Sequence, residues 1–118
     1  MAEIVLVDDD PSFTETLGAL LSRAGFDVVT APSYAEAREY LSGHTPNALI
    51  TDVRLESWES GWQLVQFARE QQPSLPIVVV TGFANDHTYH EALRFRTPLF
   101  LKPFDADELV AFMRDYTT

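Results

Sequence analysis

The sequence predicts a doubly wound α/β fold, a three-layer sandwich in which a five-stranded parallel sheet lies between two layers of helices. Short runs rich in Val, Ile and Leu recur without polar alternation, which is typical of strands buried on both faces of a sheet. Segments with apolar residues at helical spacing lie between these runs. Strand and helix thus alternate five times, which favours parallel strands with right-handed crossovers.

Four of the apolar runs fit central strands, and a fifth, weaker run fits an outer strand. The strong runs are 4–7, 48–51, 77–81 and 99–101, and the weaker run is 27–31. If the strand order is the flavodoxin-like 2-1-3-4-5, the first and third strands are neighbours. We expect residues 1–118 to form one domain, because the chain shows no repeat, low-complexity stretch or linker.

Capping signals mark several helices. Asp10 followed by Pro11 is expected to start the first helix, and Gly25 to end it. The pairs Ser33/Glu36 and Asp105/Glu108 have the spacing of capping boxes at the second and fifth helices. The third helix is marked by an apolar stripe: Leu64, Val65, Phe67 and Ala68.

The segment 85–94 is the weakest of the predicted helices. The residues His87, Thr88, Tyr89 and His90 give it a low helix propensity, and its apolar stripe is poor. We expect this segment either to be mobile or to dock a partner.

The composition excludes several classes of protein. Eighteen acidic residues against eight basic ones give a net charge of −10, so the surface repels a phosphate backbone and we expect no direct nucleic acid binding. The chain has no cysteine, no apolar run of membrane-spanning length and no secretion signal at its start, so we expect a cytoplasmic protein that is not bound to a membrane. Six side chains are expected simply on the surface: His44, His87, His90, Arg23, Arg38 and Arg69.

Polar residues stand at the carboxyl ends of four predicted strands. Asp8 and Asp9 follow the first strand, Asp52 the third, Thr81 ends the fourth, and Lys102, the only lysine, follows the fifth. Function in doubly wound sheets gathers at this edge, and the predicted strand order places the three aspartates in one crevice. Three carboxylates repel one another unless a cation intervenes, and all-oxygen ligands suit Mg²⁺ better than Zn²⁺. The sequence therefore predicts a magnesium site at this edge.

A carboxylate at such a site can also act as a covalent nucleophile that accepts a phosphoryl group. A metal ion, a lysine and a hydroxyl group can then neutralise the charge on the transferred oxygens. Four motifs agree with this chemistry, and together they span nearly the whole chain: VDDDP at 7–11, ITDVRL at 50–55, VVVTGF at 78–83 and FLKPF at 100–104. With these motifs the chain resembles the receiver domains of two-component response regulators.

The resemblance implies a role for each matching acid. Asp52 would be the phosphoacceptor. Asp9 and Asp52 would bind Mg²⁺ directly, and Asp8 would act on it largely through water. The backbone carbonyl of Arg54 would complete the protein's share of the metal shell.

The resemblance also implies the phosphoryl-binding groups. Thr81 matches the hydroxyl residue that turns inward toward a phosphoryl oxygen, with Gly82 beside it. Lys102 matches the lysine that pairs with the phosphate, and the peptide bond between Lys102 and Pro103 is expected to be cis.

The implied partner is a sensor histidine kinase or a histidine phosphotransfer protein, or a small donor such as acetyl phosphate. The domain would catalyse its own phosphorylation and dephosphorylation as a signalling part, not as a metabolic enzyme. It would control an output domain absent from this chain or a separate effector through the surface of the fourth helix, fifth strand and fifth helix. That surface is also where a homodimer would form.

Two departures from the family pattern concern the site region. Leu99 stands where the family usually has the Tyr or Phe of the switch, and Phe100 is expected on the opposite face of the strand. The segment 56–60, which includes Trp58, is one residue longer than usual, so that Gly61 follows Asp52 by nine positions. We expect phosphorylation still to move Thr81. The coupling of this movement to the last helices is expected to be altered.

Three other functions are compatible with parts of the sequence. A phosphatase similar to the haloacid dehalogenase-type enzymes would use Asp8 as its nucleophile, but the chain is short and has no cap domain. An interaction module regulated without phosphorylation would fit the missing aromatic residue and the longer loop. A flavodoxin-like nucleotide binder would need a phosphate-cradling loop where three aspartates stand instead.

Overall fold

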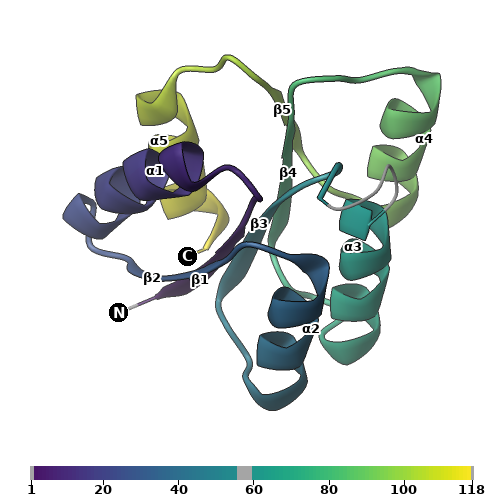
Figure 1. Cartoon of the computed structure of the whole chain (residues 1–118), viewed down its shortest axis with the longest axis horizontal. Helices are drawn as coiled ribbons and strands as arrows, with labels where there is room; N and C mark the ends of the chain where they lie inside the picture. Colours follow the sequence, from purple (N-terminus) through teal and green to yellow (C-terminus); the bar gives the residue numbers. More distant parts are fainter. Residues whose placement is uncertain (1, 56–59, 118) are drawn as a thin grey trace.

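In the computed structural model, which describes residues 2–55 and 60–117, five strands alternate with five helices (Figure 1). The strands are β1 (Glu3–Val7), β2 (Asp27–Ala31), β3 (Ala48–Asp52), β4 (Ile77–Thr81) and β5 (Leu99–Leu101). The helices are α1 (Pro11–Arg23), α2 (Tyr34–Gly43), α3 (Ser60–Gln71), α4 (Asp86–Phe95) and α5 (Ala106–Tyr116). The predicted strands lie where expected, except that β1 begins one residue earlier and β3 ends one residue later.

The five strands form one parallel sheet in the order β2-β1-β3-β4-β5, which confirms the predicted fold class. The helices α1 and α5 cover one face of the sheet, and α2, α3 and α4 cover the other (Figure 1). No helix in the described residues is long and apolar enough to cross a membrane.

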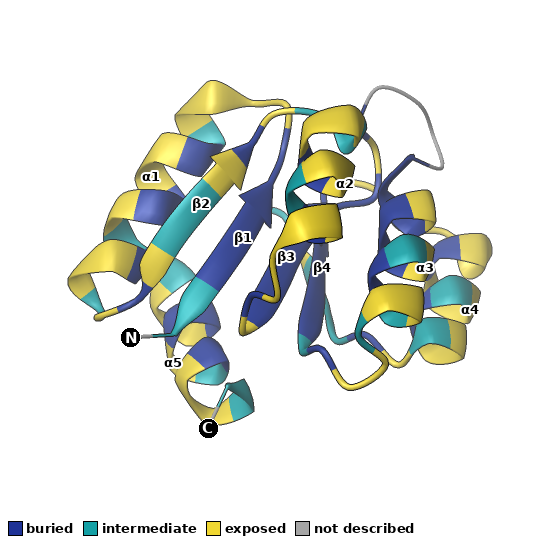
Figure 2. Cartoon of the chain, turned by 90° about the horizontal axis from the view of Figure 1, so that it is seen from below, coloured by how far each residue is buried: buried dark blue, intermediate teal, exposed yellow. Residues whose placement is uncertain are grey.

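The core consists of two apolar layers, one on each face of the sheet. Strands β3 and β4 are buried at every position, and β1 is buried at all but its first residue (Figure 2). Successive side chains of a strand point to opposite faces, so one apolar run supplies both layers. Burial on both faces thus explains why these runs show no polar alternation.

The helix starts follow the predicted caps with one difference. The Asp10 carboxylate accepts from the backbone N–H of Ser12 at 3.0 Å, and Ser33 caps α2 through its hydroxyl oxygen. At α5, Asp105 accepts from the N–H of Asp107 at 2.9 Å, one residue earlier than the capping-box spacing suggests. Gly25 has φ 101°, a left-handed conformation that suits glycine just beyond the end of α1.

The segment predicted as the weakest helix is helical from Asp86 to Phe95. A reciprocal capping box compensates for its low propensity: Asn85 Oδ1 accepts from the Thr88 N–H at 2.9 Å, and Thr88 Oγ1 accepts from the Asn85 N–H at 3.2 Å. Arg96, the capping residue directly after the helix, adopts a left-handed conformation with φ 58°. The described side chains of this helix that are buried form a narrow stripe, Thr88 and Ala92.

The prediction of a surface role is wrong for Arg69. Its guanidinium is half-buried and donates to backbone carbonyls in two other segments: Nε to Phe95 at 3.0 Å, Nη2 to Arg96 at 3.3 Å, and Nη1 to Leu75. Burial lowers the pKa of Arg69, and the electrostatic interaction with Tyr116 partly offsets this effect. Arg69 therefore ties the end of α4 to α3 and to the segment before β4.

Candidate functional site at the carboxyl ends of the strands

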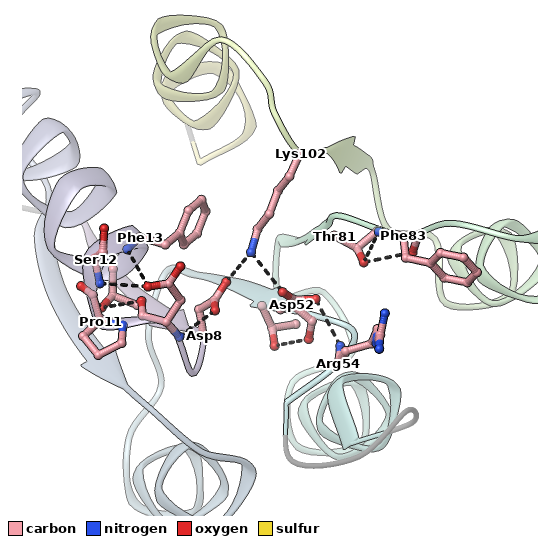
Figure 3. A network of polar contacts seen from close by, with 12 residues as sticks. Asp8, Pro11, Ser12, Phe13, Asp52, Arg54, Thr81, Phe83 and Lys102 are labelled. Carbon is pink, nitrogen blue, oxygen red and sulfur yellow. Dashed lines mark hydrogen bonds and ion pairs between the residues drawn. The ribbon is translucent and has the colours of Figure 1, made fainter.

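The predicted site residues gather at the carboxyl edge of the sheet (Figure 3). Asp8 directly follows β1, and Asp52 is the last residue of β3. Thr81 is the last residue of β4, and Lys102 directly follows β5, where its backbone N–H donates to the Thr81 carbonyl at 2.8 Å. Because the strands are parallel and adjacent in the order β1-β3-β4-β5, Asp52, Thr81 and Lys102 line one pocket, and Asp8 contacts Lys102.

The Lys102 ammonium lies between two of the aspartates (Figure 3). Its Nζ donates to Asp8 Oδ2 at 2.7 Å and to Asp52 Oδ2 at 3.0 Å. The second oxygens of the carboxylates accept from the backbone: Asp8 from the Asp10 N–H at 3.0 Å, and Asp52 from the Arg54 N–H at 3.1 Å. Both acids are therefore held by hydrogen bonds from two sides.

The electrostatics of this arrangement favour the charged lysine. Burial alone lowers the pKa of Lys102, but the hydrogen bonds to Asp8 and Asp52 outweigh that effect and raise the pKa above its ordinary value of 10.5. Lys102 thus supplies the positive charge that the two carboxylates require.

The sequence predicts three carboxylates in one crevice, and the structure brings them together only in part. Asp9 is exposed and lines the same pocket as Asp52, whereas Asp8 is buried and reaches Asp52 through Lys102. Among residues 2–55 and 60–117, no three acidic or histidine side chains converge closely enough to hold a metal ion. The Lys102 ammonium is thus the charged neighbour that Asp8 and Asp52 share.

The pocket has a volume of about 560 Å³ and is lined by Asp9, Asp52, Arg54, Leu55, Thr81, Gly82, Phe83 and Lys102. The Thr81 hydroxyl is buried and bonded to the Phe83 backbone: it donates to the carbonyl at 3.0 Å and accepts from the N–H at 3.2 Å. The loop after β4 is thus joined to the end of that strand through one side chain. The exposed Phe83 ring lies 5.8 Å from the Arg54 guanidinium carbon.

The end of β5 agrees with the sequence in two respects. The Lys102–Pro103 peptide bond is cis. Leu99 packs on the α2–α3–α4 layer, and Phe100 packs on the opposite layer against Phe104 and Phe112. The expected opposite orientation of Phe100 is therefore confirmed.

Gly61 marks a close approach of two backbone segments beside the site. Its N–H donates to the Val53 carbonyl at 2.9 Å, and a Cβ at this position would lie 2.1 Å from the Asp52 carbonyl oxygen. Only glycine fits such a contact. Residues 56–59 of the segment predicted to be longer than usual, Trp58 among them, lie outside the described residues.

The sequence did not predict the contact of Phe13 with the site. The Phe13 ring, in the first turn of α1, lies with its centroid 4.1 Å from Lys102 Nζ (Figure 3). Phe13 follows the aspartates by only a few positions, but its apolar character and helical spacing indicate a core residue. The available signal was its closeness in sequence to Asp8 and Asp9.

The fold and this site define a flavodoxin-like α/β domain with a lysine-bridged acidic site at the carboxyl ends of its strands. The family model for the response regulator receiver domain matches residues 4–114. The chain belongs to this family and is a receiver domain of two-component response regulators.

Relatives with curated descriptions agree. The chain is 35% identical over 107 residues to the photosynthetic apparatus regulatory protein RegA of Cereibacter sphaeroides, and 32% identical over 109 residues to the DNA-binding transcriptional regulator NtrC of Escherichia coli. These matches cover 90% and 92% of this chain, but 58% and 23% of those proteins. The chain thus spans less than two thirds of the length of either relative.

Solved structures show the same fold. A CheY-like receiver domain protein from Methanospirillum hungatei superposes with a TM-score of 0.93 over 99% of this chain and 94% of that one, at 22% identity. A response regulator receiver protein from Sinorhizobium medicae is 30% identical, with a TM-score of 0.89 over 98% of this chain and 94% of that one.

Proposed function

We propose that this receiver domain acts in phosphorelay signal transduction and that Asp52 accepts the phosphoryl group. The donor is a phosphohistidine on a sensor histidine kinase or a histidine phosphotransfer protein. A carboxylate oxygen of Asp52 attacks phosphorus while the bond from phosphorus to the imidazole nitrogen breaks, and the histidine leaves with the electron pair. The observation that carries the proposal is the position of Asp52, which lines the pocket and lies 3.0 Å from the only lysine.

The exposure of the aspartates favours Asp52 over Asp8 as the nucleophile. The Asp52 side chain is 11% exposed and lines the pocket, whereas the Asp8 side chain is 1% exposed. A nucleophile must reach the phosphorus atom of a large donor, so the more accessible carboxylate is the better acceptor. The same comparison argues against the phosphatase alternative.

The donor chemistry at the site fits Mg²⁺. Asp8, Asp9 and Asp52 offer carboxylate oxygens, the Arg54 backbone offers a carbonyl oxygen, and a hard divalent ion prefers such ligands. These four residues would hold the ion. When bound, it would neutralise charge on the oxygens of the transferred group.

Thr81, Gly82 and Lys102 form the proposed phosphoryl-binding set. Lys102 would move its hydrogen bond from the Asp52 carboxylate to a phosphoryl oxygen. The Thr81 hydroxyl would leave the Phe83 backbone and donate to another phosphoryl oxygen. Because both present hydrogen bonds of this hydroxyl hold the loop after β4, its departure would free that loop to change the surface of α4, β5 and α5.

The partners follow from the family. The domain would control an output domain or an effector protein, and homodimers would form through the surface of α4, β5 and α5. The net charge of −10 supports a role without direct contact to nucleic acid, and we propose that the domain acts in the cytoplasm, away from membranes. Its own catalysis would be limited to its phosphorylation and dephosphorylation.

The test is intact-protein mass after incubation with acetyl phosphate, with and without Mg²⁺. We expect a Mg²⁺-dependent phosphoryl adduct on the wild type and no adduct on Asp52→Asn. Asp27→Asn is the matched control, because Asp27 is an exposed aspartate at the opposite end of the sheet, and it should be labelled normally. No adduct under any condition would favour the phosphorylation-independent interaction module, and an adduct mapped to Asp8 would favour the phosphatase.

A further inference from the structure

The Lys102 ammonium has a third contact besides the two carboxylates. Its Nζ lies 4.1 Å from the centroid of the Phe13 ring (Figure 3). An aromatic ring attracts a cation within about 6 Å of its centroid, most strongly where water is excluded. The Lys102 side chain is 24% exposed, so the ring replaces much of the water that the ammonium would otherwise bind.

The fold holds the Phe13 ring independently of the acidic site. Phe13 lies in the first turn of α1, where its backbone N–H donates to the capping carboxylate of Asp10 at 3.4 Å. Its ring packs edge-to-face against Phe104, with centroids 6.0 Å apart and an interplanar angle of 82°. Neither contact depends on the charge state of Asp8 or Asp52.

We propose that Phe13 is a positioning residue for phosphoryl transfer, because its ring holds the Lys102 ammonium at the site while the ammonium changes partners. This inference rests on the proposed function. Nζ would lose its present contacts with the two carboxylates when Asp52 is phosphorylated and Asp8 takes part in binding a metal ion. The Phe13 ring is uncharged and would stay in place. The ring thereby lowers the conformational entropy that the lysine loses when it binds a phosphoryl oxygen.

The variants that test this role separate the aromatic face from ordinary packing. Phe13→Leu keeps an apolar side chain and removes the ring, and Phe13→Tyr keeps the ring. Phe112→Leu is the matched control, because Phe112 is half-buried in the same apolar layer and makes its ring contacts with Phe100 and Tyr116.

The first measurement is the affinity for beryllofluoride, a phosphoryl analogue, in the presence of Mg²⁺. We expect Phe13→Leu to bind it about fivefold more weakly than the wild type, the size of a partly desolvated cation–π contact. Phe13→Tyr and Phe112→Leu should stay within about twofold of the wild type, since both keep an aromatic ring beside the lysine.

The second measurement uses the fact that Lys102 is the only lysine of the chain. Protein labelled with ¹³C and ¹⁵N in lysine alone gives the side-chain NMR signals of one residue, and a ring-current shift on its ε protons reports the Phe13 contact. We expect this shift in the wild type alone, with Mg²⁺, and with Mg²⁺ and beryllofluoride, and its loss in Phe13→Leu. If Phe13 had only a structural role, the ring-current shift on the Lys102 ε protons would not persist when the ammonium moves from Asp52 to beryllofluoride.

Two results would overturn the proposal: equal beryllofluoride affinity in the wild type and Phe13→Leu, or loss of the wild-type ring-current shift when beryllofluoride binds. The second result needs no variant, so the proposal stays testable even if Phe13→Leu does not fold. A wild type that binds no beryllofluoride would instead refute the proposed function, and the role of Phe13 with it.

Discussion

Lys102 and Arg69 are both long cationic side chains that join separate segments, but they bind different kinds of partner. Lys102 joins two carboxylates, Asp8 and Asp52, at the carboxyl edge of the sheet. Arg69 joins three backbone carbonyls, two at the end of α4 and one before β4. Carboxylates change their charge when they bind a proton, a metal ion or a phosphoryl group, and backbone carbonyls do not. One cation therefore belongs to a contact that can switch, and the other to a permanent link.

The largest effect is expected for Lys102→Met. Removing the ammonium leaves the buried Asp8 charge beside Asp52 without a counterion, so we expect the free energy of unfolding at neutral pH to fall by about 3 kcal/mol. Mg²⁺ should restore part of this loss, because the ion would supply the missing positive charge. Urea unfolding with and without Mg²⁺ measures both effects. If Mg²⁺ stabilises the wild type as much as this variant, Lys102 and the metal ion do not share the two carboxylates.

A smaller loss is expected for Arg69→Met. The variant keeps much of the apolar stem but leaves three carbonyls without their donor, and water can replace the donor in part because Arg69 is only half-buried. We expect a loss of about 2 kcal/mol in the free energy of unfolding, the same with and without Mg²⁺. A Mg²⁺-dependent recovery of Arg69→Met would contradict the distinction between a switching contact and a permanent one.

The smallest effect is a loss of stability at alkaline pH. Only the Lys102 contact should show this loss. The pKa of Lys102 is raised in the folded protein, because its hydrogen bonds to Asp8 and Asp52 outweigh the effect of burial, which lowers it. The contact then contributes fully below the unfolded-state pKa of about 10.4 and is lost as the pH rises through the folded-state pKa.

We therefore expect the stability difference between the wild type and Lys102→Met to shrink above about pH 10.4. The difference between the wild type and Arg69→Met should not shrink there, since arginine remains protonated in proteins. Urea unfolding at a series of alkaline pH values tests both. A constant difference for Lys102→Met would show that the ion pair contributes nothing to stability.

The sequence predicted the fold well because the central strands are buried on both faces, which leaves an unmistakable continuous apolar pattern. It also predicted which polar residues share the carboxyl edge, since parallel strands carry their ends to the same side. The weak helix α4 was harder to judge, because the reciprocal bonds between Asn85 and Thr88 outweigh low propensity and do not show in an apolar stripe.

Other features depend on contacts distant in sequence. Arg69 was predicted to be a surface charge because no neighbouring residue in the sequence indicates its carbonyl partners. Those at the end of α4 lie 26 and 27 residues away. The contacts of Lys102 with Asp8 and Phe13 join residues about ninety positions apart, its contact with Asp52 joins residues 50 positions apart, and only the folded sheet brings them together. The position of an ammonium between acids is a result of the fold, not of a local pattern.

The contact between Gly61 and Val53 has a consequence for where the length of this domain can change. Its N–H is bonded to the Val53 carbonyl, so the chain leaves the end of β3 and returns to it at nearly the same place. Residues can be gained or lost between these two points without a change in the register of β3 or the start of α3. A change of length between Val53 and Gly61 would therefore leave Asp52 in its place at the end of β3.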